Sequence, residues 1–597
     1  MNRGSNKLLI LFFLVFCIFT YVLVLLTNKE AIIIEDTSNV DVEFDNFLAD
    51  YWDNQLDSFP LYSSSLGFSK YDRKISSNSI RAHNELLEIS KKDLNKLLEF
   101  DVTLLNDDNQ LNFKLLKAHL ENDISVNSNP TYFLDLNQRG GIQNFYDSAS
   151  RLSFEKYEDY ENWLFRLNLF ANNVINSLNN NRLGLEKGIT QPRHIIQKVV
   201  EQLKNLLDLG VENSPFLNIF KDSTSLTIDE KEYLLNEAKI LIADTLNPSY
   251  EELYNFLNDE YLPNTRVSIG LQDIPGGKEW YESLVKYHTT TDLTPDEIHA
   301  IGLAEIARIR SEMETVIESV GYEGNFKSFL DFLRNDQRFY YDDPNDLLNA
   351  YLVMAKKIDP LLTKIFKKFP RAPYGVIPIP DDIAPYTTTA YYYSPSEDRP
   401  GYFYANLYKP ESRPKYEIPV LTIHEAVPGH HFQISLAQEL ENVPDFRKHQ
   451  SFTVFVEGWG LYSEELGEFL NLYDDPYDKF GQLTYDMWRA IRLVVDTGMH
   501  YKDWSRQDAI DLFVNNTAKS LLDIENEVDR YLIMPGQALA YKIGQMKIKE
   551  LRIKASNELG DNYDIKEYHY EVLKRGALPL DVFEGYINEW IESKKSS

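Results

Sequence analysis

One short stretch constrains this chain more than any other, because three of its eleven histidines lie between His424 and His431. Glu425 directly follows His424. A His-Glu pair with a second histidine one helical turn later is typical of a zinc-peptidase helix, in which two imidazoles bind Zn²⁺ and the glutamate accepts the proton of the attacking water. The stretch therefore predicts a helix that carries a metal site.

The spacing of these histidines is unusual, because the position four residues after His424 is Pro428, which cannot bind a metal. In a regular helix His431 lies on the same face as His424 but roughly 10 Å along the axis. A bulge at Pro428 and Gly429 that absorbs two residues brings His430 to the i+4 place instead. We therefore predict His430 as the second ligand and keep His431 as the alternative. A surface His-Pro-Gly turn without a metal is the remaining interpretation.

Length and composition limit the classes of protein. The chain has 597 residues, of which 43% are hydrophobic, so it can bury a large core. Its net charge of −31 argues against a nucleic-acid partner, which needs a basic footprint. The single cysteine, Cys17, rules out an internal disulfide and a cysteine-based zinc site in the rest of the chain.

The N-terminal segment is strongly apolar. Leu8–Leu26 carries no charge and is about long enough to span a bilayer as a helix. Arg3 and Lys7 precede it, so the positive-inside rule places the rest of the chain outside the cytoplasm. We expect residues 1–28 to form an uncleaved anchor in the lipid bilayer and residues 29–45 an irregular acidic tether. A buried helix is the alternative to the anchor.

The body of the chain has the periodicity of helices. Apolar residues recur at three- and four-residue intervals with charges between them. Examples are Ser79–Leu105, Asp107–Glu121, Tyr157–Leu178, His194–Leu209 and Ile228–Thr245. Thr294, Pro295 and Glu297 form a capping box that starts another helix. We predict a mainly α-helical metallopeptidase-like body over residues 46–597, with an N-terminal part (46–290) and a zinc-site part (291–597).

Residues 370–410 form the one clearly non-helical region. Alternating Tyr, Thr and Phe, with a Pro-Gly turn between them, favour a small β-hairpin or sheet beside the metal helix. In zinc peptidases such a strand commonly pairs with the substrate backbone. We therefore predict Gly401–Asn406 as a substrate-lining edge strand, with Tyr402, Tyr404 and Asn406 as substrate contacts. His431 is a further candidate contact, and an ordinary hairpin with aromatic packing is the alternative.

Glu457 is a carboxylate within an otherwise apolar run. A buried carboxylate is costly unless it is paired or bound to a metal. Its separation from Glu425 leaves room for a second helix to cross the first, so we predict Glu457 as the third ligand. Glu464 and Glu465 lie on a more polar stretch. We expect them to be solvated or to accept a hydrogen bond from a metal-binding imidazole.

Two later stretches offer hydrogen-bond donors for catalysis. Arg492, Asp496 and His500 recur at four-residue steps and share one face if the helix continues across Gly498. Tyr541 lies on a predicted helix after a Pro-Gly turn. A hydrolase that activates water needs a donor for the developing oxyanion, and His500 and Tyr541 are the candidates. An ion-paired helix face and a packed tyrosine are the alternatives.

Four motifs, in this order, resemble the bacterial domain-of-unknown-function 885 family. They are His-Glu-Ala-Val-Pro-Gly-His-His-Phe-Gln, Val-Glu-Gly-Trp-Gly-Leu-Tyr-Ser-Glu, Arg-Leu-Val-Val-Asp-Thr-Gly-Met-His and Pro-Gly-Gln-Ala-Leu-Ala-Tyr-Lys-Ile-Gly. That family is similar to the mostly helical glutamate-zincin peptidases, such as thimet oligopeptidase and dipeptidyl peptidase III. The latter also has an insertion between its two histidines. The resemblance, over roughly residues 45–590, implies His424, His430 and Glu457 as zinc ligands and Glu425 as general base, and it indicates no substrate.

Three functional classes remain open. We predict the first, a membrane-anchored, extracytoplasmic zinc peptidase that acts on peptides. The second is a metal-dependent hydrolase of another amide or ester, such as a cell-wall crosslink. The third is a non-catalytic helical binding protein, against which the intact His-Glu pair argues. The sequence contains no Gly-x-Ser-x-Gly elbow, phosphate loop or dinucleotide-binding glycine pattern that would support another enzyme class.

Overall fold

Helices make up most of the computed structural model, which describes residues 39–381, 384–396 and 399–596. The mainly α-helical class predicted from the periodicity is confirmed. The predicted anchor, Leu8–Leu26, lies outside the described residues. Within the described ranges, none of the helices combines the length and the apolar character needed to cross a bilayer.

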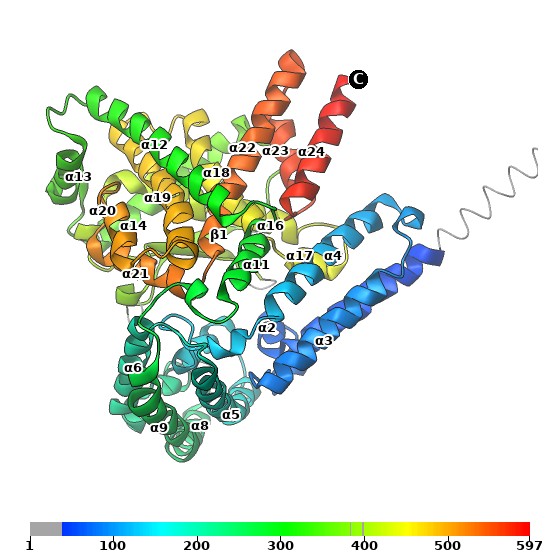
Figure 1. Ribbon diagram of the computed structural model, residues 1–597, viewed down its shortest axis with the longest axis vertical. Coiled ribbons are helices and arrows are strands. Elements are labelled where there is room, and N and C mark those ends of the chain that lie inside the picture. The colour runs from blue at the N-terminus through cyan, green and yellow to red at the C-terminus, as the bar shows by residue number, and fades with distance from the viewer. Residues whose placement is uncertain (1–38, 382–383, 397–398, 597) are drawn as a thin grey trace, which may run out of the picture.

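The first half of the chain is almost wholly helical. Its helices are residues 39–58, α2 (Pro60–Ser65), α3 (Ile80–Leu97), α4 (Asp107–Asn127), α5 (Tyr157–Lys187), α6 (Arg193–Asp208), α7 (Asn218–Lys221), α8 (Ile228–Leu241), α9 (Asn247–Phe256), α10 (Leu262–Asn264) and α11 (Gly277–Thr289). Figure 1 shows α3 and α4 as a long pair at one side of the molecule, with α5, α6, α8 and α9 grouped below the rest. The predicted helices are present here, with ends that differ by several residues.

The second half carries the remaining helices and the sheet. Its helices are α12 (Pro295–Ser319), α13 (Phe326–Asn335), α14 (Pro344–Ile358), α15 (Ile418–Glu425), α16 (His430–Gln438), α17 (Asp445–His449), α18 (Thr453–Phe469), α19 (Pro476–Tyr501), α20 (Arg506–Val514), α21 (Leu521–Ile533), α22 (Ala540–Leu559), α23 (Ile565–Leu573) and α24 (Leu580–Lys595). Thr294 caps α12 and forms the predicted capping box with Glu297. Helix α18 packs along α22, and α12 packs along α19.

The segment expected to be an irregular tether is partly ordered, which corrects that prediction. Residues 39–45 belong to the helix that runs to residue 58. Phe44 is fully buried and packs edge-on against Phe100, with their ring centroids 5.1 Å apart. The apolar face of this helix therefore packs into the folded body.

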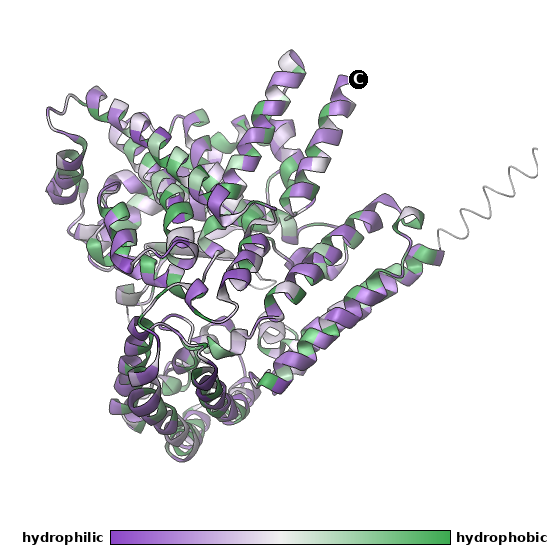
Figure 2. Ribbon diagram, viewed as in Figure 1, coloured by the Kyte–Doolittle hydropathy of each residue, from purple (hydrophilic) through white to green (hydrophobic). Residues whose placement is uncertain are grey.

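The main hydrophobic core joins both halves of the chain. It includes Phe44 and Leu116 from the first half and Phe432 and Trp459 from the second. A second cluster belongs to the first half alone, around Trp163. Figure 2 shows hydrophobic and hydrophilic residues alternating along the outer helices, as expected for helices with one face on a core. The main core thus spans the predicted boundary near residue 290.

The sheet has three short strands, β1 (Tyr374–Pro378), β2 (Ala390–Tyr393) and β3 (Gly401–Ala405). Their order is β1-β3-β2, with β1 parallel and β2 antiparallel to β3. A small sheet beside the metal helix is therefore confirmed, but the prediction that Gly401–Asn406 is an edge strand is wrong. Strand β3 is central, because the segment at Tyr374 returns to pair on its other side, and both of its edges are already bonded.

Candidate metal centre

The predicted metal helix is interrupted between Glu425 and His430. Helix α15 ends at Glu425 and α16 begins at His430, with non-helical backbone angles at Ala426 (ψ −104°) and Gly429 (ψ −128°). The main-chain N–H of Gly429 donates to the carbonyl of Ile423 at 3.0 Å, a bond that residue 427 makes in a regular helix. Two residues are therefore looped out, as a break between two helices rather than the expected bulge, and His430 occupies the i+4 place.

Two neighbouring features hold this break. A Cβ atom on Gly429 would lie 2.0 Å from the carbonyl oxygen of His424, so no other residue fits there without moving the backbone. The indole N–H of Trp459, on α18, donates to the carbonyl of Pro428 at 2.8 Å. The loop therefore has a defined position relative to α18.

Ligand atoms of His424, His430 and Glu457 converge at the break and all lie within 4.8 Å of one another. Oε2 of Glu457 lies 3.4 Å from Nε2 of His430 and 4.0 Å from Nε2 of His424. Glu457 comes from α18, which packs across α15 and α16. The crossing helix expected from the sequence thus brings its carboxylate to the two imidazoles.

These three residues fit a zinc ion. Two donor atoms bound to a tetrahedral zinc at about 2.0–2.1 Å lie roughly 3.4 Å apart, close to the separations seen here. Oε2 of Glu457 is buried and has no hydrogen-bond partner among the described residues. Such an atom is costly to bury unless it binds something. Two imidazoles and a carboxylate are also the donors of catalytic zinc sites.

Gly460 lets α18 approach the two imidazoles closely. A Cβ atom at this position would lie 3.0 Å from Cε1 of His424 and 3.1 Å from Cε1 of His430. Gly460 is not among the site residues predicted from the sequence. A glycine inside an apolar helical run was the available signal, because it usually marks a close approach.

The partner of His424 is a buried carboxylate. Nδ1 of His424 lies 2.8 Å from Oε1 of Glu464, which has no exposed surface. Burial lowers the pKa of His424 well below its usual value, and the nearby Arg489 lowers it further. The imidazole is therefore held neutral, as a metal ligand must be. Burial raises the pKa of Glu464 to about 8, against the opposing effect of Arg489.

Glu425 lies beside the three converging side chains and is 8% exposed. Burial raises the pKa of Glu425 to about 7, and the negative charge of Glu457 raises it as well. His430 and a hydrogen bond from the main chain of Tyr392 act in the opposite direction. A carboxylate with a pKa near neutrality can both accept and release a proton, as a general base requires.

Tyr541, predicted as a donor, lies on the Glu457 side of the centre. Burial raises the pKa of Glu457, but His430 and, to a smaller extent, a hydrogen bond from the Tyr541 hydroxyl hold it below its usual value. The guanidinium of Arg492 lies over the Tyr541 ring, 4.5 Å from the centroid. The phenol is therefore fixed close to the converging ligands.

Two predicted histidines lie elsewhere. His431 is 1% exposed, and its ring nitrogens contact the hydroxyl of Tyr392 at 2.9 Å and the carbonyl of Ala372 at 3.1 Å. His500 is equally buried and accepts from the N–H of Leu271 at 3.1 Å, while its Nε2 lies 3.0 Å from the carbonyl of Tyr531. The structure brings neither imidazole to the three converging ligands.

The predicted substrate contacts on and just after β3 lie in different surroundings. The amide of Asn406 is buried and donates to the carbonyls of Ala384, Thr387 and Thr388, so it shapes the loop before β2. Tyr402 and Tyr404 are half-buried, and Tyr404 stacks on Tyr391 with ring centroids 4.8 Å apart. The strand that contacts α15 is β2.

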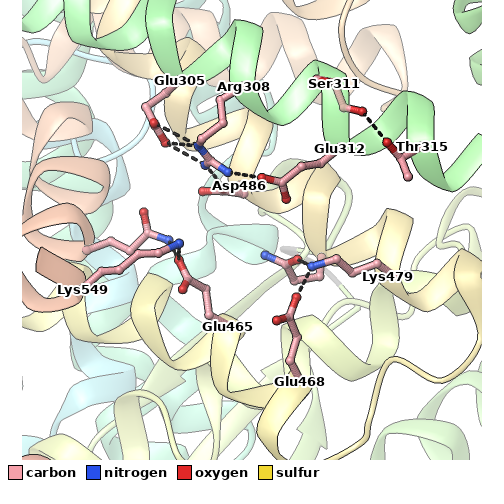
Figure 3. Close-up of polar contacts among 12 residues, drawn as sticks. Glu305, Arg308, Ser311, Glu312, Thr315, Glu465, Glu468, Lys479, Asp486 and Lys549 are labelled. Atoms are coloured by element: carbon pink, nitrogen blue, oxygen red, sulfur yellow. Dashed lines mark hydrogen bonds and ion pairs between the residues drawn. The ribbon is translucent and has the colours of Figure 1, made fainter. Parts of the chain in front are cut away.

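Ion pairs link α18 to two neighbouring helices (Figure 3). Glu465 on α18 pairs with Lys549 on α22 at 3.0 Å, and Glu468 pairs with Lys479 on α19. Glu465 therefore binds a neighbouring helix, whereas Glu464, one residue earlier, points to His424. Both pairs are partly exposed and add little to the buried packing that positions α18.

Comparison with solved structures shows the same fold in other bacterial proteins. A Colwellia psychrerythraea protein described as a "putative lipoprotein" has a TM-score of 0.86 and 25% identity, over 93% of this chain and 100% of its own. A Shewanella oneidensis protein described as a lipoprotein "of unknown function" has a TM-score of 0.72 and 16% identity, over 92% of this chain and 99% of its own. A Bacillus anthracis protein described as a "putative oligoendopeptidase F" reaches a TM-score of only 0.25 at 12% identity, over 85% of this chain and 96% of its own. This score is too low to indicate a shared fold.

No curated protein matches this sequence. One family model matches residues 60–587, which include both helical halves, the sheet and every residue of the candidate metal centre. The chain therefore belongs to the family described as "Bacterial protein of unknown function (DUF885)".

Proposed function

We propose that this protein is a zinc-dependent hydrolase that cleaves peptide bonds. The observation that carries the proposal is the convergence of His424, His430 and Glu457 beside a buried glutamate, Glu425. A zinc ion held by these three residues would act as a Lewis acid that makes water a better nucleophile. The charge and the burial of the donor set support zinc, and the fourth position of such a site is free for water or substrate.

Two residues around the centre have different roles in the reaction, one as a general base and one as a hydrogen-bond donor. Glu425, with its pKa near neutrality, accepts the proton of the attacking water and returns it to the leaving amine. Tyr541 lies beside Glu457, and its hydroxyl can donate to the carbonyl oxygen as negative charge develops there. Both roles are the ones predicted from the sequence, and the positions of Glu425 and Tyr541 support them.

Strand β2 supports a peptide as the substrate. The N–H of Asn406 donates to the carbonyl of Thr389 at 3.0 Å, so by alternation the main-chain groups of Ala390 and Tyr392 point away from β3. The Tyr392 N–H reaches the Glu425 carboxylate. We propose that an extended substrate lies along this edge and places its scissile bond near Glu425. The apolar segment Leu8–Leu26 supports an extracytoplasmic site of action.

The test uses the full-length protein in detergent, measured for zinc and incubated with a peptide library whose products are read by mass spectrometry. Wild type should cleave the library. Glu425→Gln should keep its zinc and lose about three orders of magnitude of turnover, because an amide cannot take the proton of water. Glu468→Gln, on the exposed side of α18, is the matched control and should cleave as wild type does. A folded protein without zinc, or an active Glu425→Gln variant, would reject the proposal. Cleavage of non-peptide amides alone would instead support a metal-dependent hydrolase of another amide.

A further inference from the structure

Three arginines surround a single carboxylate beside the candidate metal centre. Arg530 contacts Glu527 at 3.0 Å, Arg492 contacts the same carboxylate at 3.1 Å, and Arg139 lies 3.8 Å from it. Arg492 is on α19 and Arg530 on α21, whereas Arg139 comes from an irregular segment in the first half of the chain. We call Arg139, Arg492 and Arg530 the arginine cluster.

The positive charge of this cluster is not balanced by its one carboxylate. Arg492 and Arg530 are each 7% exposed, so water does little to screen them. Nη1 of Arg492 is buried and has no hydrogen-bond partner within the described ranges. A buried charge that is only partly compensated is costly, and such an excess is notable in a chain with a net charge of −31. The arrangement is complementary to one more anionic group.

The cluster adjoins the residues proposed for catalysis. The Arg492 guanidinium lies over the ring of Tyr541, whose hydroxyl bonds to Glu457. Arg530 donates to the side-chain oxygen of Gln537 at 2.7 Å, and Gln537 in turn bonds to Tyr541. An anion bound here would therefore sit on the Tyr541 side of the site.

One side of the cluster is open to solvent. The Arg139 side chain is 38% exposed, unlike the two buried members. Its segment is held against α21 by Gln138, whose amide donates to the carbonyl of Asp529 at 3.3 Å. A ligand group would therefore approach the cluster from the Arg139 side.

We propose that the arginine cluster binds a carboxylate of the peptide substrate and so sets where the chain is cut. Guanidinium groups present paired N–H donors that match a carboxylate, which is the one strong anion that unmodified peptides carry. The group is either the C-terminal α-carboxylate or an acidic side chain. This inference rests on the proposed peptidase function.

The test measures binding to the zinc-loaded, full-length Glu425→Gln protein, so that turnover does not intervene. The probes are two pools of N-acetylated hexapeptides with the same sequences, one ending in carboxylates and the other in carboxamides. A third pool of carboxamides carries one glutamate at each position in turn. The variants, each added to Glu425→Gln, are Arg492→Gln, Arg492→Lys, Arg139→Gln and the exposed control Arg81→Gln, which lies on α3.

A carboxylate should tighten binding at least tenfold, and the pool that shows this identifies its source. Arg139→Gln and Arg492→Gln should reduce that ratio to about one, Arg492→Lys should restore part of it, and Arg81→Gln should keep it. A purely structural role changes affinity for all pools alike and leaves the ratio intact. Because Arg139 is exposed, its variant keeps the test valid if Arg492→Gln does not fold.

Equal binding of all pools, or no binding of any, overturns the inference. The same pools, given to wild type, separate this result from the proposed function. Cleavage without a preference for carboxylates would contradict the carboxylate site and remain consistent with the proposed hydrolase. Selective binding of carboxylates without any cleavage would contradict the proposed hydrolase and still support the carboxylate site.

Discussion

Nδ1 of His424 lies 2.8 Å from the Glu464 carboxylate, which is wholly buried behind it. With Nδ1 on Glu464, Nε2 faces Glu457, and when Nε2 binds a metal the Nδ1–H donates to Glu464, which must then accept as the carboxylate. Because such a partner orients a ligand and raises its basicity, its loss typically costs 10–100-fold in metal affinity. The ligand set therefore depends on a residue that does not touch the metal position.

We expect Glu464→Gln, which keeps an acceptor oxygen, to weaken zinc binding about tenfold and Glu464→Leu about a hundredfold. Competition with a chelator of known affinity measures both. The control is Glu468→Gln, one turn along α18, where the side chain is 53% exposed. Wild-type affinity in both Glu464 variants would show that this contact has no part in metal binding.

Gly460→Ala should weaken zinc binding while the fold is retained. The added methyl group would lie 3.0 Å from the His424 ring and 3.1 Å from the His430 ring, so one imidazole must turn. We expect roughly a tenfold loss of affinity, comparable to other disturbances of ligand orientation. Gly585→Ala, in open space on α24, should leave zinc affinity unchanged. Equal affinity in the two variants would contradict the close approach of α18.

Tyr541→Phe should lower kcat by about 10²–10³-fold, the usual cost of losing one donor to the developing oxyanion. Zinc content at saturating zinc should stay at the wild-type level, because all three proposed ligands remain, although loss of the hydrogen bond to Glu457 should weaken the affinity. Steady-state rates on a peptide cleaved by wild type, together with metal analysis, check both points. A variant with full kcat would assign the donor role to another group.

Asp529→Asn should destabilise the protein in a pH-dependent way. Asp529 is unexposed and accepts hydrogen bonds from Arg506 at 2.7 Å, Lys198 at 2.5 Å and His194 at 3.0 Å, joining α6 to α20 and α21. Burial alone would raise its pKa, but these partners hold it well below its usual value. Removing a buried ion-pair partner costs about 3 kcal/mol.

The sign of the pH effect follows from that lowered pKa. The Asp529 contribution is complete above the unfolded-state pKa, about 3.9, and is lost as pH falls toward the lower folded-state value. The difference in unfolding free energy between wild type and Asp529→Asn should therefore shrink by about 1 kcal/mol between pH 5 and pH 3. Denaturant titrations measure it, with the exposed Asp511→Asn as control. A difference that grows on acidification would contradict the assignment.

Local signals in the sequence were sufficient for much of the site. Pro428 and Gly429 pointed to two extra residues, and the Gly429 N–H to Ile423 bond shows where they are accommodated. The apolar neighbours of Glu457 indicated a buried carboxylate on a crossing helix, and the structure places it there. Each of these signals lies within a few residues of the position that it concerns, so periodicity and spacing describe them well.

Features made by distant segments could not be predicted. Both ring nitrogens of His500 contact groups from other segments, Leu271 and Tyr531, which no local pattern reveals. The strand at Tyr374 takes the far edge of β3, so the order of the sheet depends on how the chain returns. Arg139 lies in an irregular segment and reaches Glu527, which is far along the chain.

The most direct test of the account is the zinc content of wild type, His430→Ala and His431→Ala, each as the full-length protein in detergent. Zinc is measured by mass spectrometry after dialysis, and only preparations with the same helical content are compared. The predicted result is about one zinc per chain in wild type and in His431→Ala, and none in His430→Ala. His431 contacts Tyr392 and Ala372 instead of the metal position, so its loss should cost stability and not zinc. Zinc retained by His430→Ala and lost from His431→Ala would contradict the central claim.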